Sequence, residues 1–141
     1  MEKILVFKTS TDATMDKLFG ELGMQEIDCL IQSSQLSRYQ TQYPSVNFID
    51  ICREGFYDLP AEIIDRISSK PYDQLYVTFS GAKGHNYGNV MELVEKVNFK
   101  NAYFYNYNGD KVRIPGKNVV KDTFCRLYIK WIDFIYGRKG E

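Results

Sequence analysis

The side chains best suited to chemistry in this sequence lie in two polar segments, each of which follows an apolar run. The first segment, residues 8–14, brings several hydroxyl groups and the carboxyl group of Asp12 to the start of a helical pattern. Free backbone N–H groups and the positive end of the helix dipole make such a place suitable for phosphate. Helix capping by Thr11 and Asp12 also explains these residues, and the charge of Asp12 would repel a phosphate. The candidate ligand-binding residues of this segment are Thr9, Ser10, Thr11 and Thr14.

The second polar segment, residues 80–89, is rich in glycine. Its three glycines let the backbone approach a ligand, Lys83 supplies positive charge, and His85 can donate or accept a proton. It lacks the Gly-Lys-Ser/Thr ending of a Walker loop, which excludes that mode of ATP binding. A glycine-rich turn before a helix capped by Asn89 needs no function, so both interpretations stay open. The candidate ligand-binding residues here are Ser80, Gly81, Lys83, Gly84, Asn86 and Tyr87, and the candidate catalytic residues of the chain are Asp12 and His85.

These segments belong to a chain in which apolar runs alternate with helical patterns. Strands are expected over 3–7, 27–31, 46–51, 72–79 and 101–107, and helices over 35–42, 89–97 and 118–136. A further helix is expected between the polar turn at 9–12 and a cap at Gly23, and another opens at Pro60, with Ile63, Ile64 and Ile67 on its inner face. Asn108-Gly109 predicts a hairpin turn into a short run at 111–114. Alternation of this kind predicts right-handed βαβ units and a sheet that is covered on both faces.

The sequence therefore predicts an α/β fold, a three-layer α/β/α sandwich around a mainly parallel, five-stranded sheet of Rossmann-like or flavodoxin-like type. The strand over 3–7 is expected in a central position. Ligands of such sheets bind beyond the carboxyl ends of the strands, near the point where the strand order reverses. Both polar segments are expected at that edge, as is Asp50, whereas Asp28 and Asp73 lie near strand starts and are expected to pair locally.

The 141 residues predict a single domain, 1–141, that ends in an amphipathic helix over 118–136. That helix carries two apolar stripes. The first is Val120, Phe124, Leu127, Tyr128, Trp131 and Ile135, and the second is Cys125, Ile129, Ile132 and Tyr136. Packing on the sheet explains one stripe. The second predicts a contact with another part of the domain, with a second copy of the chain or with a partner protein.

Composition narrows the class of protein further. Hydrophobic residues make up 44% and charged residues 26%, and 18 basic residues balance 18 acidic ones, so no net charge favours nucleic acid as a partner. Cys29, Cys52 and Cys125 lie in apolar runs and are expected to be buried, reduced thiols rather than a zinc site or disulfides. No run approaches the ~20 apolar residues of a membrane span. We expect a cytoplasmic protein with no metal and no cofactor.

The chain resembles the amino-terminal Rossmann-like half of GT-B glycosyltransferases, especially those of the heptosyltransferase type. As in that family, a strand at 3–7 leads into a Ser/Thr loop and a helix, and residues 27–31 are similar to its second strand. Residues 43–47 resemble the segment before its third strand, and 71–77 resemble the Tyr-Asp-hydrophobic strand that follows. The similarity covers residues 3–107 and rests mainly on strand patterns. It implies a module of glycan biosynthesis that binds a sugar, a sugar phosphate or a nucleotide.

The sequence departs from that family in its first loop and in its length. The family carries a Gly-Asp pair whose Asp is the general base, whereas Ala13 and Thr14 occupy that place here and Asp12 comes earlier. A chain of 141 residues also has no room for the family's second half, which binds the nucleotide sugar. We therefore expect any transferase activity to require a partner domain. A non-catalytic interaction module is the alternative function.

Flavodoxin is the second family that the sequence resembles. Residues 9–14 are similar to the flavodoxin phosphate loop, and residues 80–89 resemble a flavin-stacking loop. The departures are Asp12, which stands where that family has Gly or Ala, and residues 43–50, which offer no aromatic loop at the expected place. This resemblance implies FMN or another nucleotide as an alternative ligand.

Overall fold

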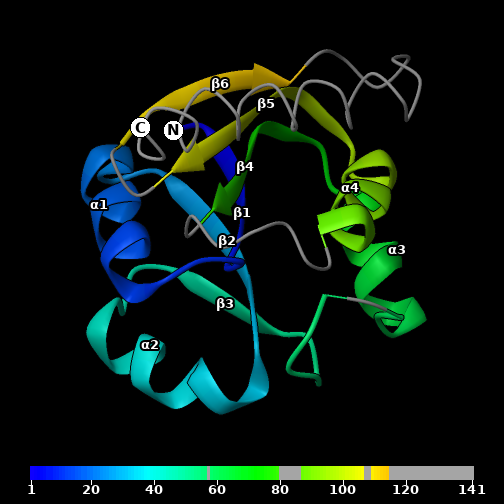
Figure 1. Ribbon diagram of the computed structural model, residues 1–141, viewed down its shortest axis with the longest axis horizontal. Coiled ribbons are helices and arrows are strands. Elements are labelled where there is room, and N and C mark those ends of the chain that lie inside the picture. The colour runs from blue at the N-terminus through cyan, green and yellow to red at the C-terminus, as the bar shows by residue number, and fades with distance from the viewer. Residues whose placement is uncertain (57, 80–86, 107–108, 115–141) are drawn as a thin grey trace, which may run out of the picture.

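A six-stranded sheet forms the centre of the computed structural model, which describes residues 1–56, 58–79, 87–106 and 109–114 (Figure 1). The strands are β1 (Lys3–Phe7), β2 (Glu26–Ile31), β3 (Asn47–Asp50), β4 (Tyr72–Phe79), β5 (Phe99–Asn106) and β6 (Lys111–Ile114). Their order is β3-β2-β1-β4-β5-β6. The first five strands run parallel, and only β6 is antiparallel to its neighbour. The predicted α/β fold and the interior position of the first strand are confirmed.

The sheet has six strands rather than the five that the sequence predicts, because the short run after the hairpin also joins it. Ala102 pairs with Ile114 and Tyr105 with Lys111. Gly109 has φ +84°, a conformation that glycine adopts without the steric cost of a side chain, so the chain can turn tightly here. An antiparallel strand in a hairpin also needs no crossover helix. The addition of β6 makes the sheet mixed rather than wholly parallel.

Helices cover both faces of the sheet. They are α1 (Asp12–Leu22), a 3₁₀ turn η1 (Ser33–Gln35), α2 (Leu36–Gln42), α3 (Ala61–Ser69) and α4 (Tyr87–Lys96). Figure 1 shows α1 and α2 on one side of the strands and α3 and α4 on the other. Strand β1 contributes to both layers, since Ile4 and Val6 belong to the core beneath α1 while Leu5 and Phe7 belong to the core beneath α3 and α4. The three-layer sandwich follows from a central strand that is apolar on both faces.

Several element boundaries differ from the predicted ones by one or two residues. The helix expected over 35–42 is α2, which begins one residue later and follows the 3₁₀ turn η1, while β3 is shorter, and β5 and α4 both begin earlier. Cys29 is buried as expected and burial raises the pKa of its thiol, but Cys52, also expected to be buried, is exposed in the loop after β3. Cys125 and the helix over 118–136 lie outside the described residues. Within them, no helix is both long enough and apolar enough to cross a membrane.

The strand order reverses between β1 and β4. The chain passes from β1 outward to β2 and β3, then returns through α3 to place β4 on the other side of β1. The carboxyl ends of β1 and β4 therefore meet where ligands bind in sheets of this kind, as the register pair Phe7–Val77 shows.

Asp28 pairs with side chains near the strand starts, and it links β2 to β3 and to the start of β4. This buried carboxylate accepts hydrogen bonds from Lys70 Nζ at 2.8 Å, the Tyr72 hydroxyl at 2.7 Å and Asn47 Nδ2 at 3.0 Å. Burial alone would raise the pKa of Asp28, but hydrogen bonds from Lys70, Asn47 and Tyr72 hold it below its ordinary value. Asp73 accepts a hydrogen bond from the Lys3 backbone N–H at 2.8 Å, which is also a pairing near the strand starts.

The contacts of Asp28 predict that Asp28→Asn lowers the free energy of unfolding by about 2–4 kcal/mol at neutral pH, because Lys70, Tyr72 and Asn47 lose the charged acceptor that they share. Of the described carboxylates, Lys70 then keeps only Glu26, at 3.7 Å. The folded-state pKa of Asp28 is depressed, so this stability is present above the unfolded pKa of ~3.9 and is lost as pH falls through the folded value. Urea unfolding between pH 2 and 7 (roughly the range of carboxyl titration) measures both effects. The exposed control Asp65→Asn should change the unfolding free energy by less than ~0.5 kcal/mol. Equal losses in both variants would contradict this account.

Candidate functional site

The loop that follows β1 is fastened to β4 by two threonines. The Thr9 hydroxyl donates to the Thr78 carbonyl oxygen at 2.6 Å, and the Thr9 backbone N–H donates to Thr78 Oγ1 at 3.2 Å. The Thr78 hydroxyl in turn donates to the Phe7 carbonyl oxygen at 2.8 Å. These hydrogen bonds join the carboxyl ends of β1 and β4. A ligand at this edge would therefore lie beyond the two threonines, on their solvent side.

The other predicted hydroxyl groups of the first segment also make contacts within the protein. The Ser10 hydroxyl lies 3.5 Å from Met15 Sδ, and the hydroxyls of Thr11 and Thr14 are 3.3 Å apart. Thr11 is the N-cap residue of α1, but its side chain makes no capping hydrogen bond, and Asp12 is the first residue inside the helix. The expected capping by these two residues is thus not made. The first-turn N–H groups of α1 keep their capacity to bind an acceptor.

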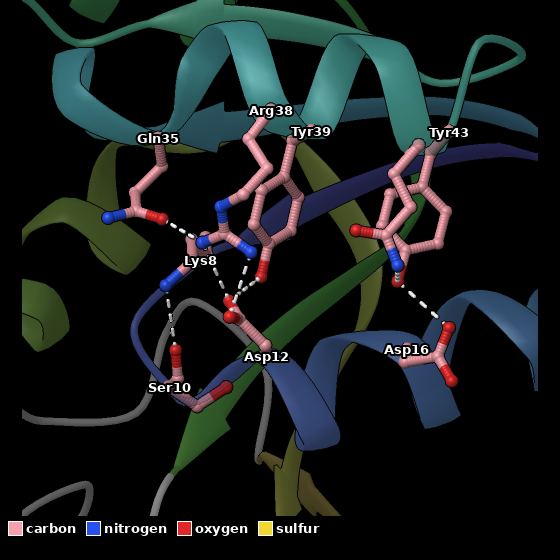
Figure 2. A network of polar contacts seen from close by, with 9 residues as sticks. Lys8, Ser10, Asp12, Asp16, Gln35, Arg38, Tyr39 and Tyr43 are labelled. Atoms are coloured by element: carbon pink, nitrogen blue, oxygen red, sulfur yellow. Dashed lines mark hydrogen bonds and ion pairs between the residues drawn. The ribbon is translucent and has the colours of Figure 1, made fainter.

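Asp12 turns its carboxylate toward α2 (Figure 2). Arg38 approaches it with both guanidinium nitrogens, Nη1 at 2.9 Å and Nη2 at 3.2 Å, and the buried Tyr39 hydroxyl donates to it at 2.5 Å. Gln35 accepts a further hydrogen bond from Arg38. Hydrogen bonds from Arg38 and Tyr39 lower the pKa of Asp12 below its ordinary value. In this arrangement the carboxylate is a weak proton acceptor, and Arg38 offsets the charge that would repel a phosphate.

Lys8 belongs to this site, although its sequence pattern does not single it out as a candidate. It directly follows β1, its residue exposure is 8%, and its ammonium donates to the Ser10 carbonyl oxygen at 2.9 Å. The ammonium also lies 5.6 Å from the centre of the Tyr39 ring. Burial lowers the pKa of Lys8, and the nearby Asp12 opposes this shift. No carboxylate of the described residues lies within ion-pair distance of Lys8. The sequence pattern that would have predicted this role is a lysine at the first position after a buried strand.

The carboxyl ends of β2 and β3 lie beside this loop. Gln32 follows β2 and donates from Nε2 to the Lys8 carbonyl oxygen at 3.1 Å. Asp50 ends β3 at the same edge, as predicted, where its Oδ1 accepts from the Ser33 hydroxyl at 2.6 Å and from the Cys52 N–H at 2.7 Å. Asp50 therefore stabilises the turn after β3, which has a left-handed backbone at Cys52, with φ 61°.

The second predicted segment lies largely outside the described residues. The predicted residues there are Ser80, Gly81, Lys83, Gly84, His85 and Asn86. Tyr87 begins α4, so the end of the segment is helical rather than a loop. The structure brings together Thr9, Ser10, Thr11, Asp12 and Thr14 at the end of β1, and their relation to His85 stays a prediction. In the part of the chain that the structure covers, no three His, Cys, Asp or Glu side chains could hold a metal ion.

Comparison of the chain with protein-family models, with curated proteins and with solved structures gave no significant match. The fold is of Rossmann-like type by its strand order and connections alone. What the site binds must therefore be argued from its own chemistry.

The Lys8 environment predicts that Lys8→Met raises the free energy of unfolding by about 1–3 kcal/mol without any ligand, because an apolar side chain of similar length replaces a poorly compensated buried charge. Chemical denaturation of the two proteins at neutral pH measures the difference. Lys96→Met, at an exposed position on α4, is the matched control and should alter stability by less than ~0.5 kcal/mol. A stability loss of more than ~1 kcal/mol in Lys8→Met would show that the ammonium stabilises the fold.

Proposed function

We propose that this chain binds a phosphorylated small molecule, a sugar phosphate or a nucleotide, at the carboxyl end of β1. The observation that carries the proposal is the buried ammonium of Lys8. It has a backbone carbonyl and an aromatic ring as neighbours, but no carboxylate of the described residues within ion-pair distance, and the nearby Asp12 is already paired with Arg38. A buried charge is costly unless it is paired, so this position favours an anionic ligand.

The start of α1 adds to the attraction of Lys8 for an anion. The helix begins at Asp12, two residues after the carbonyl group that Lys8 contacts, and Thr11 does not cap it. Its first-turn N–H groups and the positive end of its dipole favour negative charge. The Arg38–Asp12 pair is the second support, because a carboxylate that is already paired repels a phosphate less.

The proposed role is that of a binding module in glycan biosynthesis, as the resemblance to GT-B glycosyltransferases implies. Transfer of a sugar needs a general base close to the acceptor hydroxyl and positive groups near the leaving diphosphate. Both oxygens of Asp12 already accept hydrogen bonds, so His85 becomes the better candidate for the base. We therefore assign the described site to binding, and any catalytic step to a complex with a partner domain.

Amide NMR with isotope-labelled protein tests the binding site directly. Glucose 6-phosphate and UDP should each shift amide signals of residues 8–14, and Lys8→Met should weaken the affinity at least ~tenfold, since a hydrogen bond between charged groups contributes about 1.5–3 kcal/mol. Lys96→Met should bind as the natural chain does. Shifts confined to the opposite edge, around Asp28 and Asp73, or unchanged affinity in Lys8→Met, would refute the proposal.

A further inference from the structure

Two polar atoms close to the Lys8 site are buried and have no hydrogen-bond partner within the described residues. They are Gln32 Oε1, at the end of β2, and Arg53 Nε, in the loop after β3. Buried polar atoms in folded proteins nearly always have a partner, so two such atoms at one edge of a sheet need an explanation. One is an acceptor and the other a donor, and they follow neighbouring strands.

Hydrogen bonds to the main chain place these residues in a row with Lys8. Gln32 Nε2 donates to the Lys8 carbonyl oxygen at 3.1 Å, so the Gln32 amide lies against the end of β1. The Ser33 N–H donates to the Arg53 carbonyl oxygen at 3.3 Å, which places Arg53 beside the end of β2. Adjacent strands are ~4.8 Å apart, so the ends of β1 and β3 are separated by about 10 Å. The order Lys8, Gln32, Arg53 thus follows the order of the strands.

Arg53 is a second cation at this edge. It is half-buried, and no carboxylate of the residues that the structure covers lies within 4.0 Å of its guanidinium. The adjacent Glu54 instead accepts hydrogen bonds from the backbone N–H and the hydroxyl of Ser34. Because Asp50 holds the turn at Cys52, the main chain leading to Arg53 is fixed in position.

We propose that the ligand is a sugar phosphate with a second anionic group at its far end, an inference that rests on the proposed function. Lys8 and the start of α1 hold the first phosphate, and Arg53 binds the second anionic group. Gln32 Oε1 accepts a hydrogen bond from a sugar hydroxyl between them. An amide oxygen can only accept, so the middle of the ligand must supply a donor, which a hydroxyl does and a phosphate dianion does not. In a nucleoside diphosphate the two phosphates are adjacent, which does not suit two cations that follow strands whose ends are about 10 Å apart.

Calorimetric titration of the full chain with four probes tests this assignment. The probes are inorganic phosphate, glucose 6-phosphate, glucose 1,6-bisphosphate and 6-phosphogluconate. We expect the bisphosphate to bind at least ~tenfold more tightly than the monophosphate, because Arg53 adds a charge-assisted contact. Comparison of 6-phosphogluconate with the bisphosphate shows whether the second anionic group is better a carboxylate or a phosphate. Preference for either doubly charged ligand supports the proposal.

Variants assign the preference to residues. Arg53→Met should remove the preference for doubly charged ligands and leave the glucose 6-phosphate affinity within ~twofold, while Arg53→Lys should restore part of it. Gln32→Met should weaken all three sugar ligands but not inorganic phosphate. Arg113→Met is the control, since Arg113 lies on β6 and donates to Asn101 at the opposite end of the sheet. If Arg53→Met does not fold, the affinities of the four probes for the natural chain and for Arg53→Lys still test the second anion subsite.

The outcomes separate the second anion subsite from the proposed function. If no probe binds the natural chain, or if Lys8→Met binds the probes as tightly as the natural chain does, the proposed function itself fails. If glucose 6-phosphate binds through Lys8, but both doubly charged ligands bind no more tightly, the second anion subsite is refuted and the proposed function stands. The subsite is also refuted if the preference for doubly charged ligands persists in Arg53→Met.

Discussion

The burial of β1 on both faces is the constraint on which the rest of the structure depends. Helices α1 and α2 cover one face of this strand and α3 and α4 the other, so its interior positions must be apolar. A polar side chain from this part of the chain can reach a ligand only where the strand ends. Lys8 is the first residue after β1, and the reversal of strand order places that end beside β4. The location of the candidate site is therefore a consequence of the sheet.

Charge compensation then explains how the site is arranged. Arg38 and Tyr39 of α2 hold the Asp12 carboxylate, while the ammonium of Lys8 donates to the Ser10 carbonyl oxygen instead. The Arg38–Asp12 pair is solvent-exposed, so it contributes little to stability on its own. Its effect is electrostatic, because it offsets a negative charge at the start of α1. Lys8 keeps its positive charge in a buried position, and a bound phosphate would supply a counter-charge there.

The sequence predicts the architecture better than the site, and particular residues show why. Apolar runs such as 3–7 and 27–31 identify buried parallel strands, since a local pattern suffices for them. The run at 111–114 predicts the second strand of a hairpin. Whether these four residues join the sheet depends on their pairing with β5, which the local pattern does not determine. Asp12 stands out for its charge near a helix start. Its partner Arg38 lies 26 residues away on another helix, and no spacing rule links them. Lys8, Gln32 and Arg53 follow three adjacent strands, so their order along this edge is set by the strand order and not by their spacing in the sequence.

The pKa of the Lys8 side chain, followed by heteronuclear NMR without ligand and at saturation with glucose 6-phosphate, tests the central claim most directly. The account predicts a pKa below the ordinary value of ~10.4 in the free protein, because the ammonium is buried and no carboxylate of the described residues pairs with it. It further predicts that the pKa rises when the phosphate binds, since a nearby negative charge favours the protonated form. A Lys8 pKa that is ordinary in the free protein, or that does not change at saturation, would contradict the account.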